Sequence, residues 1–195
     1  MRFEKNLSRE LLTNMREAGC LKIVFGLESF NQRVMDFMKK GIKQESVRRI
    51  TEDCLDLGIA IHCYIIVGFP TETEEESLET MNFIVENQRL NSSYGFSCQP
   101  CLFDLEKEAP IMSDPGGHGI QRIMRPASED LSLGFFYEVS SGMTPEQAER
   151  VYQHVYGKVS EVVCELPFNY SMADGLLYIA RAKAQAQQVP LPAGP

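Results

Sequence analysis

Two residues of opposite charge, Glu28 and Lys40, are the first candidates for chemistry in this sequence. Glu28 ends the apolar run "KIVFGLE", and Lys40 follows twelve residues later in "MKKG". A carboxylate accepts hydrogen bonds from hydroxyl groups, and an ammonium group pairs with an anionic group. The two side chains therefore indicate either a ligand site or an internal ion pair, and position alone leaves both interpretations open.

The elements that would position these residues follow a repeated pattern. A helix that begins after Ser8 ends at Gly19 and leads into a strand; a second helix ends at Gly58, 39 residues later, and leads into another strand. This pattern is typical of βα units, which build a parallel sheet covered by helices. Active sites of such folds lie at the carboxyl ends of the strands, where Glu28 is expected.

Strand alternation predicts which residues share the face that carries Glu28. Successive side chains of a strand point to opposite faces, so Glu28 lies opposite the bulky apolar residues of its own strand. In the second strand, "IAIHCYIIVGFP", His62 and Tyr64 lie opposite the apolar set. We predict that both face the substrate. For His62 the alternative is a packed, hydrogen-bonded core residue.

The predicted fold is α/β: about the last three βα units of a TIM-like barrel, followed by a mainly helical C-terminal extension. A third strand is expected within residues 93–103. The first strand has no earlier βα unit beside it, so one flank of the sheet would be open. The predicted divisions are a partial barrel (1–104), an irregular substrate-side segment (105–143), a helical extension (144–186) and a flexible tail (187–195).

Several helix starts have local signals. Three of them have the hydroxyl residue and the glutamate or glutamine three positions later that form a capping box. The acidic run from Glu72 to Glu76 is interpreted as helix capping rather than metal binding. A last helix is expected from Ser171 to about Ala186. The three boxes pair Ser29 with Gln32, Thr73 with Glu76, and Thr144 with Gln147.

Composition excludes several classes of function. Lysine and arginine number 19 against 27 acidic residues, a net charge of −8 that opposes binding to a phosphate backbone. We therefore predict no nucleic-acid partner for this chain. No apolar run approaches the roughly 18 residues of a membrane helix, and the first residues lack the apolar core of a signal peptide. A cytoplasmic location without membrane contact is expected.

The six cysteines are spread through apolar segments, as is typical of reduced thiols that serve as small core residues. Cys98 and Cys101 have the C-x-x-C spacing of a redox pair or of half a metal site. A thioredoxin-type pair opens a long helix, and the following "LFDLEKEAP" predicts none. A thiol redox module using Cys98 and Cys101 is an alternative to the main prediction, and no metal site is predicted within the chain.

Residues 12–84 closely resemble the later half of the barrel of radical S-adenosylmethionine (SAM) enzymes. The similarity is strongest to the cobalamin-associated and coproporphyrinogen-dehydrogenase-like branches. The segment "CLFDLEKEAPIMSDPGGHGI" also looks like the one that follows the sixth strand in cobalamin-type members. Three pieces in order carry the match: "GLES" followed by a lysine and a glycine, "GFPTET" after a strand, and the threonine of "LETMNFI".

This resemblance implies roles for four residues. Glu28 would contact the ribose of SAM, and Lys40 its carboxylate. Val67 and Gly68, at the end of the second strand, would help to cradle its adenine. In members of the family, a [4Fe-4S] cluster is held by a CxxxCxxC motif, which this sequence lacks.

We therefore expect the C-terminal portion of a radical SAM enzyme, inactive alone, whose cluster is held by a missing N-terminal half or a complementing chain. Its activity would be reductive cleavage of SAM and radical modification of an unknown small-molecule or peptide substrate. The resemblance leaves open cobalamin as a cofactor of the parent protein. The alternative outside enzymes is a non-catalytic remnant that binds a partner through its open sheet edge.

Overall fold

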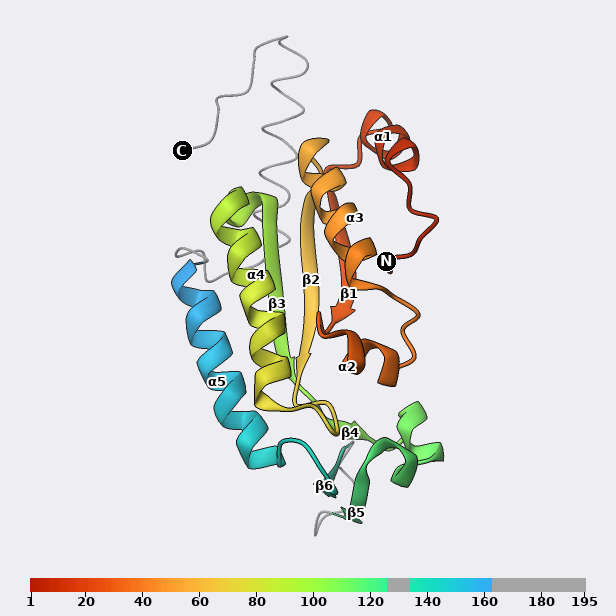
Figure 1. Cartoon of the computed structure of the whole chain (residues 1–195), viewed down its shortest axis with the longest axis vertical. Coiled ribbons are helices and arrows are strands. Elements are labelled where there is room, and N and C mark those ends of the chain that lie inside the picture. The colour runs from red at the N-terminus through yellow and green to blue at the C-terminus, as the bar shows by residue number, and fades with distance from the viewer. Residues whose placement is uncertain (126–133, 163–195) are drawn as a thin grey trace. The chain divides into compact units, whose positions relative to one another are not determined.

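The structure is a computed structural model that describes residues 1–125 and 134–162 (Figure 1). Residues Met1–Cys164 form one compact unit. The predicted last helix (Ser171 to about Ala186) and the predicted tail lie outside the described residues. The predicted division into barrel, irregular segment and helical extension remains a prediction.

The first sheet is parallel and has three strands in the order β1-β2-β3. Helices α3 and α4 lie over one face of this sheet (Figure 1). The α/β class and the third strand are thus confirmed, whereas the partial barrel remains a prediction. The elements are α1 (Arg9–Glu17), β1 (Lys22–Glu28), α2 (Gln32–Phe37), α3 (Gln44–Asp56), β2 (Ala60–Val67), α4 (Glu74–Gly95) and β3 (Phe96–Leu102).

The two faces of the parallel sheet differ in burial as alternation predicted. On the helix-covered face Phe25, Leu27 and Cys63 are fully buried, and each large apolar side chain contributes about 1.5–3 kcal/mol to folding. On the other face Val24 and Tyr64 are 40% and 45% exposed. Parallel sheets normally have both faces covered. Within the described residues, this second face is partly open.

The first residues of the chain lie along the outer edge of β1. The Met1 amino group donates to the Val24 carbonyl at 2.8 Å, and the Gly26 N–H donates to the Met1 carbonyl at 3.1 Å. The Phe3 ring stacks on Phe25 with centroids 4.0 Å apart. The edge that was expected to be open is therefore partly hydrogen-bonded by the chain itself.

A second, antiparallel sheet follows, in the order β4-β6-β5. It has a small core of its own, formed by Leu105, Ile111 and Ile120. The segment predicted to be irregular or to form short strands thus contains short strands, joined by turns that weak periodicity did not reveal. The elements are β4 (Leu105–Glu106), η1 (Pro110–Ser113), η2 (Gly116–His118), β5 (Ile120–Met124), β6 (Gly134–Val139) and α5 (Pro145–Val162).

Two of the three predicted capping boxes are confirmed. The main-chain N–H of Thr73 donates to Glu76, and that of Thr144 donates to Gln147, at 2.9 and 2.8 Å. The box at Ser29 is wrong, because Asn31 caps α2 by accepting the Val34 N–H. None of the helices in residues 1–125 and 134–162 is long and apolar enough to span a membrane.

Helix α5 approaches the parallel sheet closely at Gly68. This glycine has φ +81°, and a Cβ on it would lie 2.4 Å from the Cβ of Ala148. Both the backbone conformation and the space therefore require glycine here. The contact fixes the start of α5 against the carboxyl end of β2.

Candidate functional site

Glu28 stands on an irregular backbone at the carboxyl end of β1. The pairing of β1 with β2 shifts by one residue between Gly26 and Glu28, and Glu28 has φ +64°, which is uncommon for a residue with a side chain. Its carboxylate folds back over Gly26, where a Cβ would lie 2.8 Å from Oε1. Gly26 thus provides the space in which the Glu28 carboxylate rests on the sheet.

The structure brings Glu28 and Lys40 together. Lys40 Nζ lies 2.9 Å from Glu28 Oε1, and the two side chains are 19% and 17% exposed. Lys40 lies just beyond α2, between Lys39 (φ +55°) and Gly41 (φ +66°). The internal ion pair, one of the two interpretations of the sequence, is therefore present in this structure. Whether the pair also binds a ligand remains a prediction.

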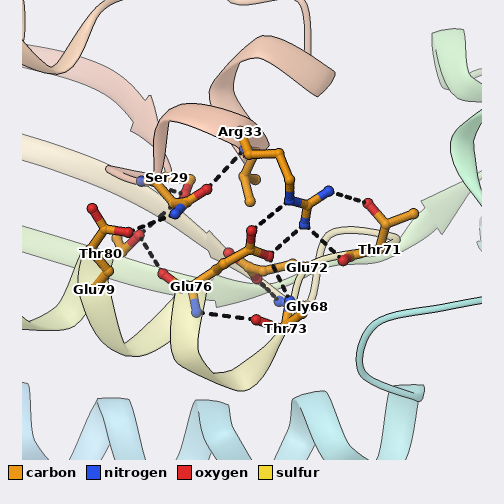
Figure 2. Close-up of polar contacts among 11 residues, drawn as sticks. Ser29, Arg33, Gly68, Thr71, Glu72, Thr73, Glu76, Glu79 and Thr80 are labelled. Carbon is orange, nitrogen blue, oxygen red and sulfur yellow. Dashed lines mark hydrogen bonds and ion pairs between the residues drawn. The ribbon is translucent and has the colours of Figure 1, made fainter.

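Arg33 connects α2 to the turn after β2 (Figure 2). Its guanidinium donates to both carboxylate oxygens of Glu76, and also to the Thr71 hydroxyl and carbonyl at 3.1 and 2.9 Å. The Glu76 hydrogen bonds raise the pKa of Arg33, and the Arg33 hydrogen bonds lower the pKa of Glu76. This contact fixes the helix that leads to Lys40.

The residues directly after β1 are also tied to α4. The Ser29 and Thr80 hydroxyls lie 3.1 Å apart, and the Phe30 N–H donates to Thr80 Oγ1 at 2.9 Å (Figure 2). Both hydroxyl residues are buried. Thr80 is the threonine of "LETMNFI", so its position beside the turn after Glu28 gives it a structural role.

Glu72 is a buried titratable residue that the sequence did not reveal. Its side chain is 1% exposed, and its carboxylate accepts the Gly68 N–H at 2.7 Å (Figure 2). Burial raises the pKa of this carboxyl to about 7. The sequence placed Glu72 in an acidic capping run, whereas the chain turns at Thr71 (φ +75°) and directs Glu72 inward.

His62 and Tyr64 lie on one face but in different environments. His62 is 4% exposed and Tyr64 is 45% exposed, and their rings meet edge to face at 5.3 Å. His62 Nδ1 lies 3.0 Å from the Ser97 hydroxyl, which itself donates to the Ile61 carbonyl. With the Ser97 proton directed to Ile61, the hydrogen bond between His62 and Ser97 is one that Nδ1–H donates. This environment fits a packed core histidine, and a substrate contact of either residue remains a prediction.

Val67 and Gly68 are largely occupied by the protein's own contacts. The Val67 side chain is 2% exposed, and its carbonyl accepts the Phe103 N–H at 2.9 Å. The Gly68 N–H donates to Glu72. An adenine contact, which remains a prediction, would therefore use main-chain surface rather than the Val67 side chain.

The cysteines of the described residues do not fit an iron–sulfur cluster or a redox pair. Cys98 and Cys101 lie three positions apart on β3, so their side chains point to opposite faces, one buried and one exposed. Burial raises the pKa of Cys54 and of Cys98 to about 12, which disfavours the thiolate that a metal needs. In residues 1–125 and 134–162, no group of three potential ligands could hold a metal ion.

Comparisons with known proteins support the resemblance. Residues 3–84 match the family model "Radical SAM superfamily". An uncharacterized methyltransferase of Pyrococcus horikoshii is 35% identical over 69 residues, which cover 35% of this chain and 15% of the relative. A tRNA-2-methylthio-N(6)-dimethylallyladenosine synthase of Caldicellulosiruptor saccharolyticus is 35% identical over 96 residues, 47% of this chain and 20% of the relative. The chain therefore spans a fifth or less of the length of these curated relatives.

One solved structure is similar over most of the chain. It is the coproporphyrinogen III oxidase (HemN) of Escherichia coli, described as a radical SAM enzyme, with a TM-score of 0.55 and 12% identity. The similarity covers 83% of this chain and 31% of that chain, and at this identity it shows the fold alone. The chain thus matches the radical SAM superfamily over residues 3–84 and shares the α/β fold of a radical SAM enzyme.

Proposed function

We propose that this chain forms one side of the SAM pocket of a radical SAM enzyme, with Glu28 and Lys40 as its principal ligand-binding residues. The observation that carries the proposal is the half-buried Glu28–Lys40 pair at the carboxyl end of β1, inside the segment that matches the superfamily. Glu28 would accept hydrogen bonds from the ribose hydroxyls, and Lys40 would pair with the methionine carboxylate.

The ion pair prepares both side chains for the ligand. The bulge and Gly26 hold the Glu28 carboxylate over the sheet, and the Arg33 contacts fix the helix that precedes Lys40. Side chains that are ordered before binding lose less conformational entropy when the ligand arrives. On binding, the Lys40 ammonium exchanges one carboxylate partner for another, so its charge stays neutralised throughout.

The [4Fe-4S] cluster, which supplies reductive SAM cleavage in this superfamily, has no fitting ligand set in the described residues. We propose that a missing N-terminal half or a complementing chain supplies it, that the present chain completes a partial barrel, and that it is inactive alone. The branch of the superfamily, including any cobalamin cofactor of the parent protein, belongs to the same proposal.

The reaction class that we propose is transfer of a methyl or methylthio group. The matched relatives include an uncharacterized methyltransferase, a putative methylthiotransferase, several tRNA-2-methylthio-N(6)-dimethylallyladenosine synthases and a cytidylyl-2-hydroxyethylphosphonate methyltransferase of Streptomyces wedmorensis. For this chain the acceptor is a small molecule or a peptide, because its net charge of −8 opposes binding of nucleic acid.

SAM titration of the full chain by isothermal titration calorimetry tests the proposal. We expect Glu28→Gln and Lys40→Met each to weaken SAM binding about tenfold, because each removes one charge-assisted contact. Lys39→Met is the matched control, since Lys39 is exposed and adjacent to Lys40. Unchanged affinity in both site variants, or no binding by the unmodified chain, would favour the partner-binding remnant instead.

A further inference from the structure

A cavity of about 430 Å³ lies apart from the Glu28–Lys40 pair, where the end of β3, strand β6 and the first turn of α5 meet. This volume is within the range of pockets that bind small molecules. The residues of its wall that matter for recognition are Phe103, Asp104, Phe135, Phe136, Tyr137 and Glu146.

Aromatic rings form much of the wall. Phe103 and Tyr137 meet edge to face, with centroids 5.7 Å apart. Phe136 is 65% exposed, the largest exposure of any large apolar side chain in the described residues. An exposed phenylalanine in a cavity wall provides apolar surface that a ligand can bury. These rings suit the flat or aliphatic part of a ligand.

The charged side chains that line the wall, among residues 1–125 and 134–162, are two carboxylates, Asp104 and Glu146. Gly134 lets Asp104 lie close against β6, since a Cβ there would be 2.7 Å from Asp104 Oδ1. Hydrogen bonding at the helix start lowers the pKa of Glu146, so this carboxylate stays ionised. Burial and, to a smaller extent, the two carboxylates raise the pKa of Tyr137 to about 12. Its hydroxyl therefore keeps its proton.

One lysine of the chain lies beside these rings, although it is not part of the cavity wall. The Lys107 ammonium lies 6.0 Å from the centroid of Phe135, at the limit of a cation–π contact. Two carboxylates and the faces of aromatic rings attract a positive charge and repel an anion. An anionic ligand would meet no basic group among the described residues of the wall.

We propose that this cavity binds an organic cation, a protonated amine attached to an aromatic or aliphatic body. The amine lies between Asp104 and Glu146, and the body lies against Phe103 and Phe136. Binding at this site does not require SAM. A titration without SAM can therefore support or refute this proposal independently of the proposed function.

The test is a titration of the full chain, without SAM, by ligand-observed NMR at low salt. The probes are 2-phenylethylamine, 2-phenylethanol and 3-phenylpropanoate, which are similar in size and are cationic, neutral and anionic. We expect the amine to bind about threefold to tenfold more tightly than the alcohol, and the acid to bind most weakly. Equal affinity for amine and alcohol, or no binding of the amine, would overturn the proposal.

Variants locate the site. The double variant Asp104→Asn with Glu146→Gln should weaken binding of the amine about threefold to tenfold. It should leave the affinity for the alcohol unchanged. Phe136→Ala should weaken binding of both probes. Because Phe136 is exposed, its truncation should leave the fold intact, which circular dichroism checks. Glu149→Gln also removes one negative charge from α5, but at a position outside the cavity wall. It should change the affinity for neither probe. Amine affinity that is unchanged in the double variant and in Phe136→Ala would also overturn the proposal.

Discussion

The turns after β1 and β2 lie at the carboxyl ends of neighbouring strands, and each begins with a residue of positive φ, Glu28 and Gly68. In the first turn, the Glu28 carboxylate is partly exposed and pairs with the Lys40 ammonium. In the second turn, the Glu72 carboxylate is buried and accepts a main-chain N–H, and no described cation forms a salt bridge with it.

The difference separates a side chain that is available to a ligand from one that holds the fold. A partly exposed ion pair can exchange one partner for a ligand at little cost, because solvent and the remaining partner still stabilise each charge. A buried carboxylate without a cation is costly in its charged form, so its proton equilibrium shifts. We therefore propose ligand binding for the first turn, and the contacts of the second turn indicate structural support.

The largest expected effect comes from filling the space at Gly68. Gly68→Ala places a Cβ 2.4 Å from that of Ala148 at φ +81°, so we expect a loss of at least about 3 kcal/mol in the free energy of unfolding. Urea denaturation measures it. Gly157→Ala is the control, because a Cβ there meets nothing within 4 Å. A loss below about 1 kcal/mol for Gly68→Ala would show that the second turn is not a rigid support.

Glu72 should make stability depend on pH. Its pKa is raised from 4.5 to about 7 by burial, so between these values the folded state holds a proton that the unfolded state has lost. Stability from this group is thus full below about pH 4.5 and falls as pH rises through about 7, by about 3 kcal/mol in total.

The variant Glu72→Gln removes this dependence. It should unfold at similar urea concentrations to the unmodified chain at pH 5 and should be the more stable of the two at pH 8. Glu74→Gln, at an exposed position in the same acidic run, controls for the loss of one charge. The account of the second turn would be wrong if the difference between Glu72→Gln and the unmodified chain were the same at both pH values.

A smaller effect is expected at Thr80, which supports the first turn. Thr80→Val leaves the buried Phe30 N–H and the Ser29 hydroxyl without this partner, so we expect a loss of about 1–3 kcal/mol. Thr51→Val is a matched control, because the buried Thr51 hydroxyl has no hydrogen-bond partner and its removal should be neutral or stabilising. Equal effects of the two substitutions in urea denaturation would argue against this link.

Sequence patterns predicted the features that depend on local periodicity. Alternation placed Glu28 and Tyr64 on the open face, and the capping boxes at Thr73 and Thr144 were confirmed. The inward turn of Glu72 could not be predicted, because it depends on a neighbouring backbone N–H and on the packing of later segments against Thr71.

The ion pair between Glu28 and Lys40 was predictable in its members rather than in its geometry. The order of motifs identified Glu28 and Lys40, but only the bulge in β1 and the space above Gly26 explain how their side chains meet. The spacing of Ser29 to Gln32 predicts a helix cap at Ser29. In the structure the next polar residue, Asn31, caps the helix, and Ser29 contacts Thr80 across the fold. Long-range contacts of this kind have no local signal.

The most direct test of the central claim is SAM affinity in a charge-swapped chain, Glu28→Lys with Lys40→Glu. The swap keeps two opposite charges at these positions, and thermal unfolding checks that the fold is kept. The methionine carboxylate would then face another carboxylate, and the ribose hydroxyls would lose the acceptor of their hydrogen bonds, so calorimetry should show SAM binding at least tenfold weaker. SAM affinity equal to that of the unmodified chain would mean that Glu28 and Lys40 form only an internal ion pair.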